Sequence, residues 1–147
     1  MLARFDEART LLQHVGADDE VLDIDARIAE CRLLKGEHDS ALGLADEILA
    51  RTDALDAIAK LAPLLQRVRG YAMLLQGDPF GAREAFEASL EAARSGNNLF
   101  EVALALTALA DFDRFEGIEP PQELVDESRA IVARLKVRAL PPQPALG

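Results

Sequence analysis

Apolar residues recur at intervals of three and four along seven stretches of the chain, and each stretch predicts an amphipathic helix. The first helix is predicted over residues 5–15. Six more are predicted over residues 21–34, 38–49, 54–76, 80–94, 99–115 and 121–135. Ala and Leu dominate these faces and β-branched runs are few, which favours closely packed helices over sheets. The pattern therefore predicts an all-α chain of about seven helices.

Glycine, proline and acidic residues mark the predicted helix ends. Gly16 is expected to stop the first helix, and the acidic residues 18–20 to open the second, because carboxylates favour the positive end of a helix. Residues 52–53 (Thr-Asp) are expected to break the chain and cap the fourth helix. Residues 77–79 (Gly-Asp-Pro) provide a stop, a cap and a first-turn proline. Pro63 lies inside the fourth helix, which it is expected to kink or split.

One short phrase occurs twice in the chain. Residues 33–37 read Leu-Leu-Lys-Gly-Glu and residues 74–78 read Leu-Leu-Gln-Gly-Asp, 41 residues apart, and a small alanine follows each at the same offset (Ala41 and Ala82). A weaker third copy ends at Gly117, 40 residues further on. Repetition at this period is typical of stacked helical repeats. The second helix should pair with the third, the fourth with the fifth, and the sixth with the seventh.

The two ends of the chain depart from this repetition. The first helix matches the second member of a pair and has no first member. That suggests a chain cut from a longer array, whereas the proline-rich ending suits a true terminal cap. The predicted helical domain covers residues 1–138. Residues 139–147 contain three prolines, have no helical pattern, and are expected to be extended or disordered.

The second copy of the phrase resembles a known repeat. Gly77 with Asp78, preceded by Gly70 and Tyr71 and followed by three helical positions, resembles the tetratricopeptide repeat; those positions are Ala82, Phe86 and Leu90. The resemblance implies a right-handed solenoid of antiparallel helix pairs. Two positions depart from it: Gln66 stands where a large apolar residue is usual, and residues 95–97 replace a terminal proline.

The repeat spacing indicates which kind of helical repeat the chain resembles. Spacings of 41 and 40 exceed the 34 residues of a standard repeat. Longer repeats rich in Ala and Leu look like the C-terminal arrays of bacterial MalT-like ATPase regulators and of adenylate cyclase–ATPase proteins, and residues 133–142 are similar to the end of such cyclase-associated chains. The resemblance carries no catalytic residue.

Charge and composition exclude several classes of function. The formal net charge is −10 and the pI about 4.6, which argues against direct binding of a nucleic-acid backbone. The acidity fits either a solvated surface or a basic partner. Cys31 is the only cysteine, so no intramolecular disulfide is possible, and we expect it to fill core space. No apolar run is long enough to span a membrane and no signal-peptide layout is present, so the predicted location is cytoplasmic.

Motifs that carry chemistry are missing from the sequence. There is no phosphate-binding glycine loop, no nucleophile elbow, and neither His14 nor His38 has a partner at metal-ligand spacing. Asp111 and Asp113 are two residues apart and should point to different faces of their helix. We therefore expect no catalytic residue, no metal and no cofactor, and predict that the chain is not an enzyme.

The resemblance also implies where a partner would bind, because the first helix of each pair lines the concave surface in that family. Tyr71, the only tyrosine, is interpreted either as a contact anchor or as a packing residue with its hydroxyl at the rim. Arg67 and Arg69 are expected either to hold a partner's carboxylate or to pair with Glu30 and Asp111. Alignment on the three glycines gives three rows of groove residues: Ala26, Arg67 and Thr107; Glu30, Tyr71 and Asp111; Leu33, Leu74 and Arg114.

The expected function is therefore protein–protein interaction, with a peptide, helix or partner chain held in the concave groove of a module from a larger bacterial regulator. A different class of function is regulation in cis of an ATPase, a cyclase or a transcription activator. A third is self-association, with the open seam at the first helix docking on another copy to give a homodimer.

Overall fold

The chain was analysed as a computed structural model, which describes residues 2–14, 18–136 and 140–146. These residues form seven α-helices and contain no strand, so the all-α prediction is confirmed. The predicted stop at Gly16 lies outside the described residues. The helices are α1 (Leu2–His14), α2 (Asp18–Leu34), α3 (His38–Leu49), α4 (Leu55–Leu75), α5 (Pro79–Ser95), α6 (Leu99–Phe115) and α7 (Gln122–Leu135).

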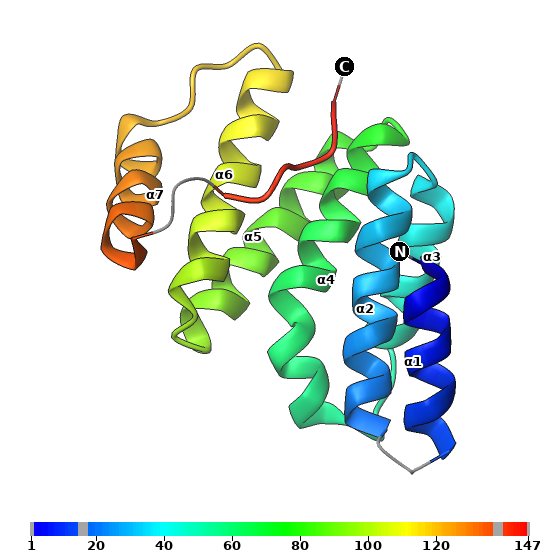
Figure 1. The fold of residues 1–147 in the computed structure, drawn as a ribbon. Helices are drawn as coiled ribbons and strands as arrows, with labels where there is room; N and C mark the ends of the chain where they lie inside the picture. The colour runs from blue at the N-terminus through cyan, green and yellow to red at the C-terminus, as the bar shows by residue number, and fades with distance from the viewer. Residues whose placement is uncertain (1, 15–17, 137–139, 147) are drawn as a thin grey trace.

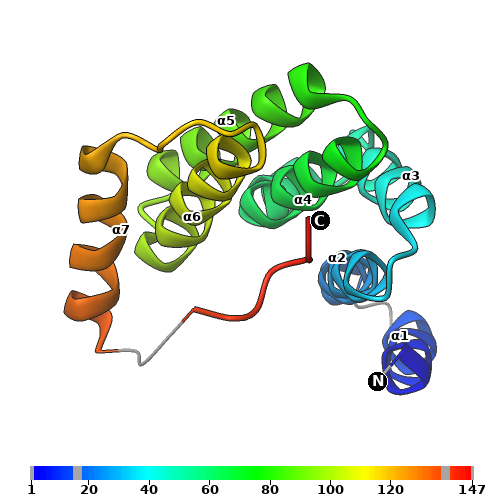
Figure 2. The same ribbon diagram turned by 90° about the horizontal axis from the view of Figure 1, so that it is seen from above.

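The helices form a curved array in which each one packs against the next (Figure 1). Contacts also join α2 to α4 and α4 to α6, skipping one helix each time. Seen from above, α2, α4 and α6 follow the inner side of the curve, while α3 and α5 lie on its outer side (Figure 2). We call the inner side the concave side. The order of contacts places α4 at the centre of the molecule.

The three glycines of the repeated phrase form equivalent turns. Gly36, Gly77 and Gly117 have φ values of 85°, 86° and 76°, a left-handed conformation that costs glycine little. After each glycine, the next amide donates to the carbonyl five residues back, for example from Asp78 N to Met73 O at 2.9 Å. This is the bonding of a helix end closed by a left-handed residue. The weaker third copy therefore has the same geometry as the first two.

The core is filled by small and aliphatic side chains around a few aromatic rings. Tyr71 and Phe86 are both fully buried and meet edge to face with ring centroids 4.9 Å apart. Gly70 allows this approach, because a Cβ at that position would overlap the Phe86 ring. Phe86 also meets Phe112 at 6.2 Å, which connects α4, α5 and α6 in one apolar unit.

One of the two alternatives for Pro63 is wrong. The helix is not split there, since it runs without a break from Leu55 to Leu75, and the kink stays a prediction. The carbonyl of Pro63 accepts a buried hydrogen bond from Ser89 Oγ at 2.6 Å, which attaches this part of α4 to α5. The predicted Thr-Asp cap at residues 52–53 is wrong as well. Ala54 is the N-cap, and the Asp53 carboxylate instead accepts two hydrogen bonds from Arg51.

The other boundary signals act as predicted. The Asp78 side chain caps α5 by accepting from Gly81 N at 3.0 Å, and Pro79 follows in the first turn. Within the described part of the chain, every helix is too short or too polar to cross a bilayer.

Candidate functional site

A segment without helical structure lies on the concave side. Residues 140–146, which we call the tail segment, run across the inner faces of α6 and α4 towards α2 (Figures 1 and 2). Leu140 packs against the apolar cluster formed by α5, α6 and α7, and Leu146 packs against the main core. Pro142, Gln143 and Pro144 lie between these two anchors. The tail segment therefore contacts the surface that the repeat resemblance marks for a partner.

Beneath the tail segment lies a buried ionic network centred on α4. The Arg67 side chain is only 4% exposed and donates from Nη1 to Glu101 Oε2 of α6 at 2.5 Å. Its Nη2 lies 3.6 Å from Glu30 Oε2 of α2. One guanidinium thus joins three inner helices, and its two carboxylate partners offset much of the cost of burying the charge. Arg67 is consequently a part of the fold that lies just below the surface.

A second polar pair connects α4 to α6. The Tyr71 hydroxyl donates to Asp111 Oδ2 at 3.1 Å, and Arg114 Nη1 lies 3.8 Å from the other oxygen of that carboxylate. Burial raises the pKa of Tyr71, so the phenol stays protonated and remains a donor. Burial also raises the pKa of Asp111, although the hydrogen bond from Tyr71 and the charge of Arg114 act in the opposite direction.

The predicted groove residues separate into a buried group and an accessible group. Glu30 and Asp111 are half-buried and Arg114 is exposed, so these three can touch a partner. Thr107 is half-buried and donates to the carbonyl of Ala103 at 2.9 Å. The remaining predicted residues lie inside the fold: Ala26, Leu33, Arg67, Tyr71 and Leu74.

The two alternatives left open for the arginines and for Tyr71 can now be compared with the contacts. Tyr71 packs between helices with its hydroxyl directed at Asp111, as in the packing interpretation. Arg67 pairs with Glu30 as expected, but its second partner is Glu101, and the pair is buried where a solvated network was expected. Arg69 turns away from this group and donates to Asp46 of α3 at 2.6 Å.

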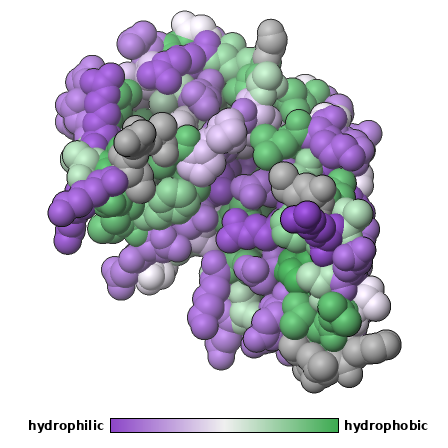
Figure 3. Space-filling view, viewed as in Figure 1, coloured by the Kyte–Doolittle hydropathy of each residue, from purple (hydrophilic) through white to green (hydrophobic). Residues whose placement is uncertain are grey.

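Several residues of the site were missed by sequence reasoning. Leu34 and Val68 line the cavity under the tail segment, and Phe115 lines a second hollow beside Pro144 and Leu146. The tail segment itself was treated as separate from the domain, although its two leucines flank a proline-rich stretch. That arrangement is a signal for a short docking segment. The face that carries it mixes hydrophilic and hydrophobic residues (Figure 3).

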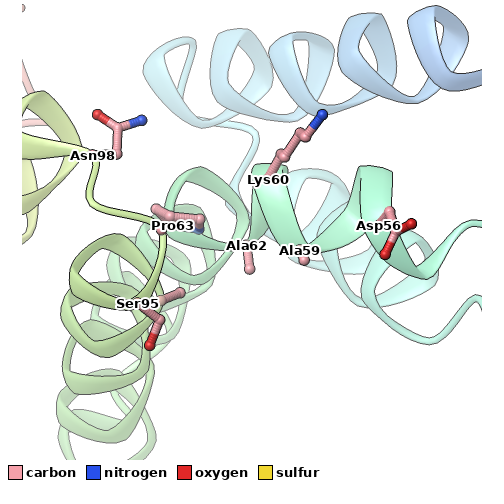
Figure 4. A pocket seen from close by; sticks show the side chains of 9 residues that line it. Asp56, Ala59, Lys60, Ala62, Pro63, Ser95 and Asn98 are labelled. Atoms are coloured by element: carbon pink, nitrogen blue, oxygen red, sulfur yellow. The ribbon is translucent and has the colours of Figure 1, made fainter.

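A larger hollow of about 610 Å³ lies elsewhere, between the first half of α4 and the turn from α5 to α6 (Figure 4). Its wall is mostly apolar, with Ala59, Ala62 and Pro63 on α4, and Lys60 and Asp56 at its edge. Helix α4 extends past the end of α5 here, which leaves the space open. Among the described residues, every buried side-chain nitrogen or oxygen has a hydrogen-bond partner.

Among the residues that the structure describes, no three His, Cys, Asp or Glu side chains are grouped to hold a metal ion. Asp111 and Asp113 serve separate partners, Tyr71 of α4 and Arg83 of α5. Cys31 is half-buried on α2, and burial raises the pKa of its thiol, which lowers the thiolate fraction at neutral pH.

No family model, curated protein or solved structure matches the chain. The function is therefore inferred from residues and geometry alone.

Proposed function

We propose that this chain is a protein-interaction module whose helices stack as tetratricopeptide-like repeats in a right-handed solenoid of antiparallel pairs. Its concave side would hold an extended segment of a partner protein. The order of helix contacts supports this proposal, because α2, α4 and α6 touch in turn while α3 and α5 lie outside them. The equivalent turns at the three glycines support it too, since one local geometry recurs at each helix junction of the repeated phrase.

The observation that carries the proposal is the occupied concave side. A seven-residue extended segment is seated there with an apolar anchor at each end. Extended peptides docked in helical grooves obtain affinity from such anchors, while polar groups at the rim set their orientation. The rim of this groove offers Glu30, Asp111, Arg114 and the exposed Leu34. A rigid network beneath them, centred on Arg67, keeps the rim in place.

The proposal is tested by selecting extended peptides from a random library on the full chain and measuring their Kd by fluorescence polarisation. Arg114→Glu and Leu34→Glu should each weaken binding about tenfold, because one reverses a rim charge and the other places a charge on an apolar contact.

The matched controls are Lys60→Glu and Leu55→Glu, the same types of change at exposed positions of α4 that line neither cavity beside the tail segment. They should leave Kd unchanged. Peptides that respond to the control pair and ignore the concave pair would show that the binding surface lies elsewhere.

A further inference from the structure

The tail segment resembles a peptide ligand in its composition as well as in its position. It contains no charged residue, three of its seven residues are prolines, and leucine stands at both ends. Prolines hold a chain near the polyproline conformation, so less conformational entropy is lost when it docks. At about 3.1 Å per residue, six steps separate the two leucines by about 19 Å. This length lets one segment reach from the cluster at α7 to the main core.

The fit between the tail segment and the helices is tight at its centre. The space left between Pro142, Gln143 and Pro144 and the faces of α2 and α4 is about 10 Å³, at the lower limit for one water molecule. Gln143 also donates to the carbonyl of Pro141 at 3.1 Å, a local bond that shapes the segment. The tail segment therefore covers the Arg67 network at residues 142–144, while a hollow of about 380 Å³ remains beside Asp111, Arg114 and Leu146.

Only some residues of the tail segment pack against the helices. Leu140 and Leu146 are half-buried against the two clusters, whereas Pro141, Pro142 and Ala145 are exposed. The contacts thus distinguish anchors from spacers. They also define what a competing peptide must supply, namely two aliphatic ends held apart by a stiff, uncharged middle.

Building on the proposed function, we propose that the groove recognises an uncharged, proline-containing extended segment with a leucine at each end, and that residues 140–146 hold this place in cis until such a partner displaces them. A ligand attached by a short linker has an effective concentration of about 1 mM. If the sequence of the segment binds the open groove with a Kd of about 100 µM, the attached copy reduces the apparent affinity of a competing peptide about tenfold.

A labelled synthetic peptide with the sequence of residues 140–146 provides the test, with the full chain as its receptor. Leu140→Ser combined with Leu146→Ser should loosen the attached segment and make the peptide bind about tenfold more tightly than it binds the unchanged chain. Ala145→Ser, an exposed position of the same segment, is the matched control and should leave the Kd unchanged. Circular dichroism on all three chains checks that the helices remain.

Two results would overturn the inference. One is equal peptide affinity for the unchanged chain and the double variant; the other is no binding to the double variant. If library peptides still bind at the Arg114 and Leu34 rim in either case, the proposed function stands and only the role of the tail segment fails.

A second measurement separates attachment in cis from exchange between copies. A spin label on Ala145→Cys, in a chain carrying Cys31→Ser, should broaden the amide signals of α2 and α4 on the concave side and spare those of α1. Mixing spin-labelled chain with isotope-labelled, label-free chain should give no broadening. Broadening in the mixture would mean that a second copy supplies the segment, and this would overturn the cis arrangement.

Discussion

The centre of the concave side and its rim differ in burial and in contacts, although the sequence analysis predicts both from the same three rows of groove residues. At the centre, Arg67 and Tyr71 are buried and join α4 to its neighbours. At the rim, Arg114 is exposed, with only a 3.8 Å contact to Asp111, a residue of its own helix. The residues of the two groups hold equivalent positions along the repeat, but one group is buried and the other is accessible. The centre therefore contributes to stability, and our proposal assigns binding to the rim.

This difference changes how substitutions on this face must be interpreted. A change at Arg67 or Tyr71 removes contacts between helices, so lost binding would reflect lost structure. A change at Arg114 or Leu34 leaves those contacts in place, so lost binding would identify the docking surface.

The largest loss of stability is expected for Arg67→Met, which keeps an unbranched apolar stem and removes the charged guanidinium. Glu101, whose side chain is 12% exposed, would then be a buried carboxylate without its cation. Breaking a buried pair in this way costs about 3–5 kcal/mol. Urea denaturation followed by circular dichroism should show this loss in the free energy of unfolding.

The matched control is Arg69→Met, two residues along the same helix. Its ion pair with Asp46 is half-exposed, so the loss should stay below about 1 kcal/mol. Adding Glu101→Gln to Arg67→Met should restore part of the stability, because the buried carboxylate is then neutral, whereas Glu30 is partly exposed and keeps Arg27 at 3.8 Å. Equal losses for Arg67→Met and Arg69→Met would show that burial of the network contributes nothing.

The next largest effect is expected at Gly70, which lies beside Tyr71 at the same central layer. Gly70→Ala would press a methyl group onto the Phe86 ring, and overpacking of this kind costs about 1–3 kcal/mol. Gly43→Ala is the control, since this helical glycine has no neighbour within reach of an added methyl group. In the Gly43→Ala variant, the better helix propensity of alanine should raise the free energy of unfolding by about 0.5–1 kcal/mol. Thermal unfolding of both variants checks the opposite signs.

The sequence was sufficient for the elements and for most of their ends. Helical spacing of Ala and Leu is a local signal, and so are the glycines at residues 36, 77 and 117, whose φ values only glycine adopts easily. The Thr-Asp pair at residues 52–53 shows where local reasoning fails. Arg51, two residues before Asp53, competes for the same carboxylate, and a capping pattern cannot weigh that competition.

Which residues of the concave side are buried could not be predicted from local signals of this kind. A row through the repeat glycines places Arg67 beside Ala26 and Thr107, but only packing in three dimensions brings Glu101 from the next helix against its guanidinium. The tail segment was beyond sequence reasoning for a related reason. Its position brings together residues about 70 to 115 positions apart, such as Leu34 and Pro142, which line the same cavity, and no local pattern encodes this.

The smallest expected effect lies at Asp111, where the centre meets the rim, and it appears as a change in pH dependence. Burial raises the pKa of Asp111 in the folded chain above its unfolded value, so the folded state holds this proton more tightly. The resulting stability is fully present below about pH 3.9, the usual Asp pKa, and is lost as the pH rises through the folded pKa.

Asp111→Asn removes this titration while its amide oxygen can still accept from Tyr71. The free energy of unfolding of the variant, measured in urea from pH 3 to pH 7, should therefore rise relative to the unchanged chain as the pH increases. Asp111→Ala removes both the charge and the acceptor, so its curve should have the same slope and lie lower throughout, because the buried Tyr71 hydroxyl loses its partner. A constant offset between the Asn variant and the unchanged chain would mean that burial does not favour the protonated carboxyl of Asp111, and would assign this residue to the rim alone.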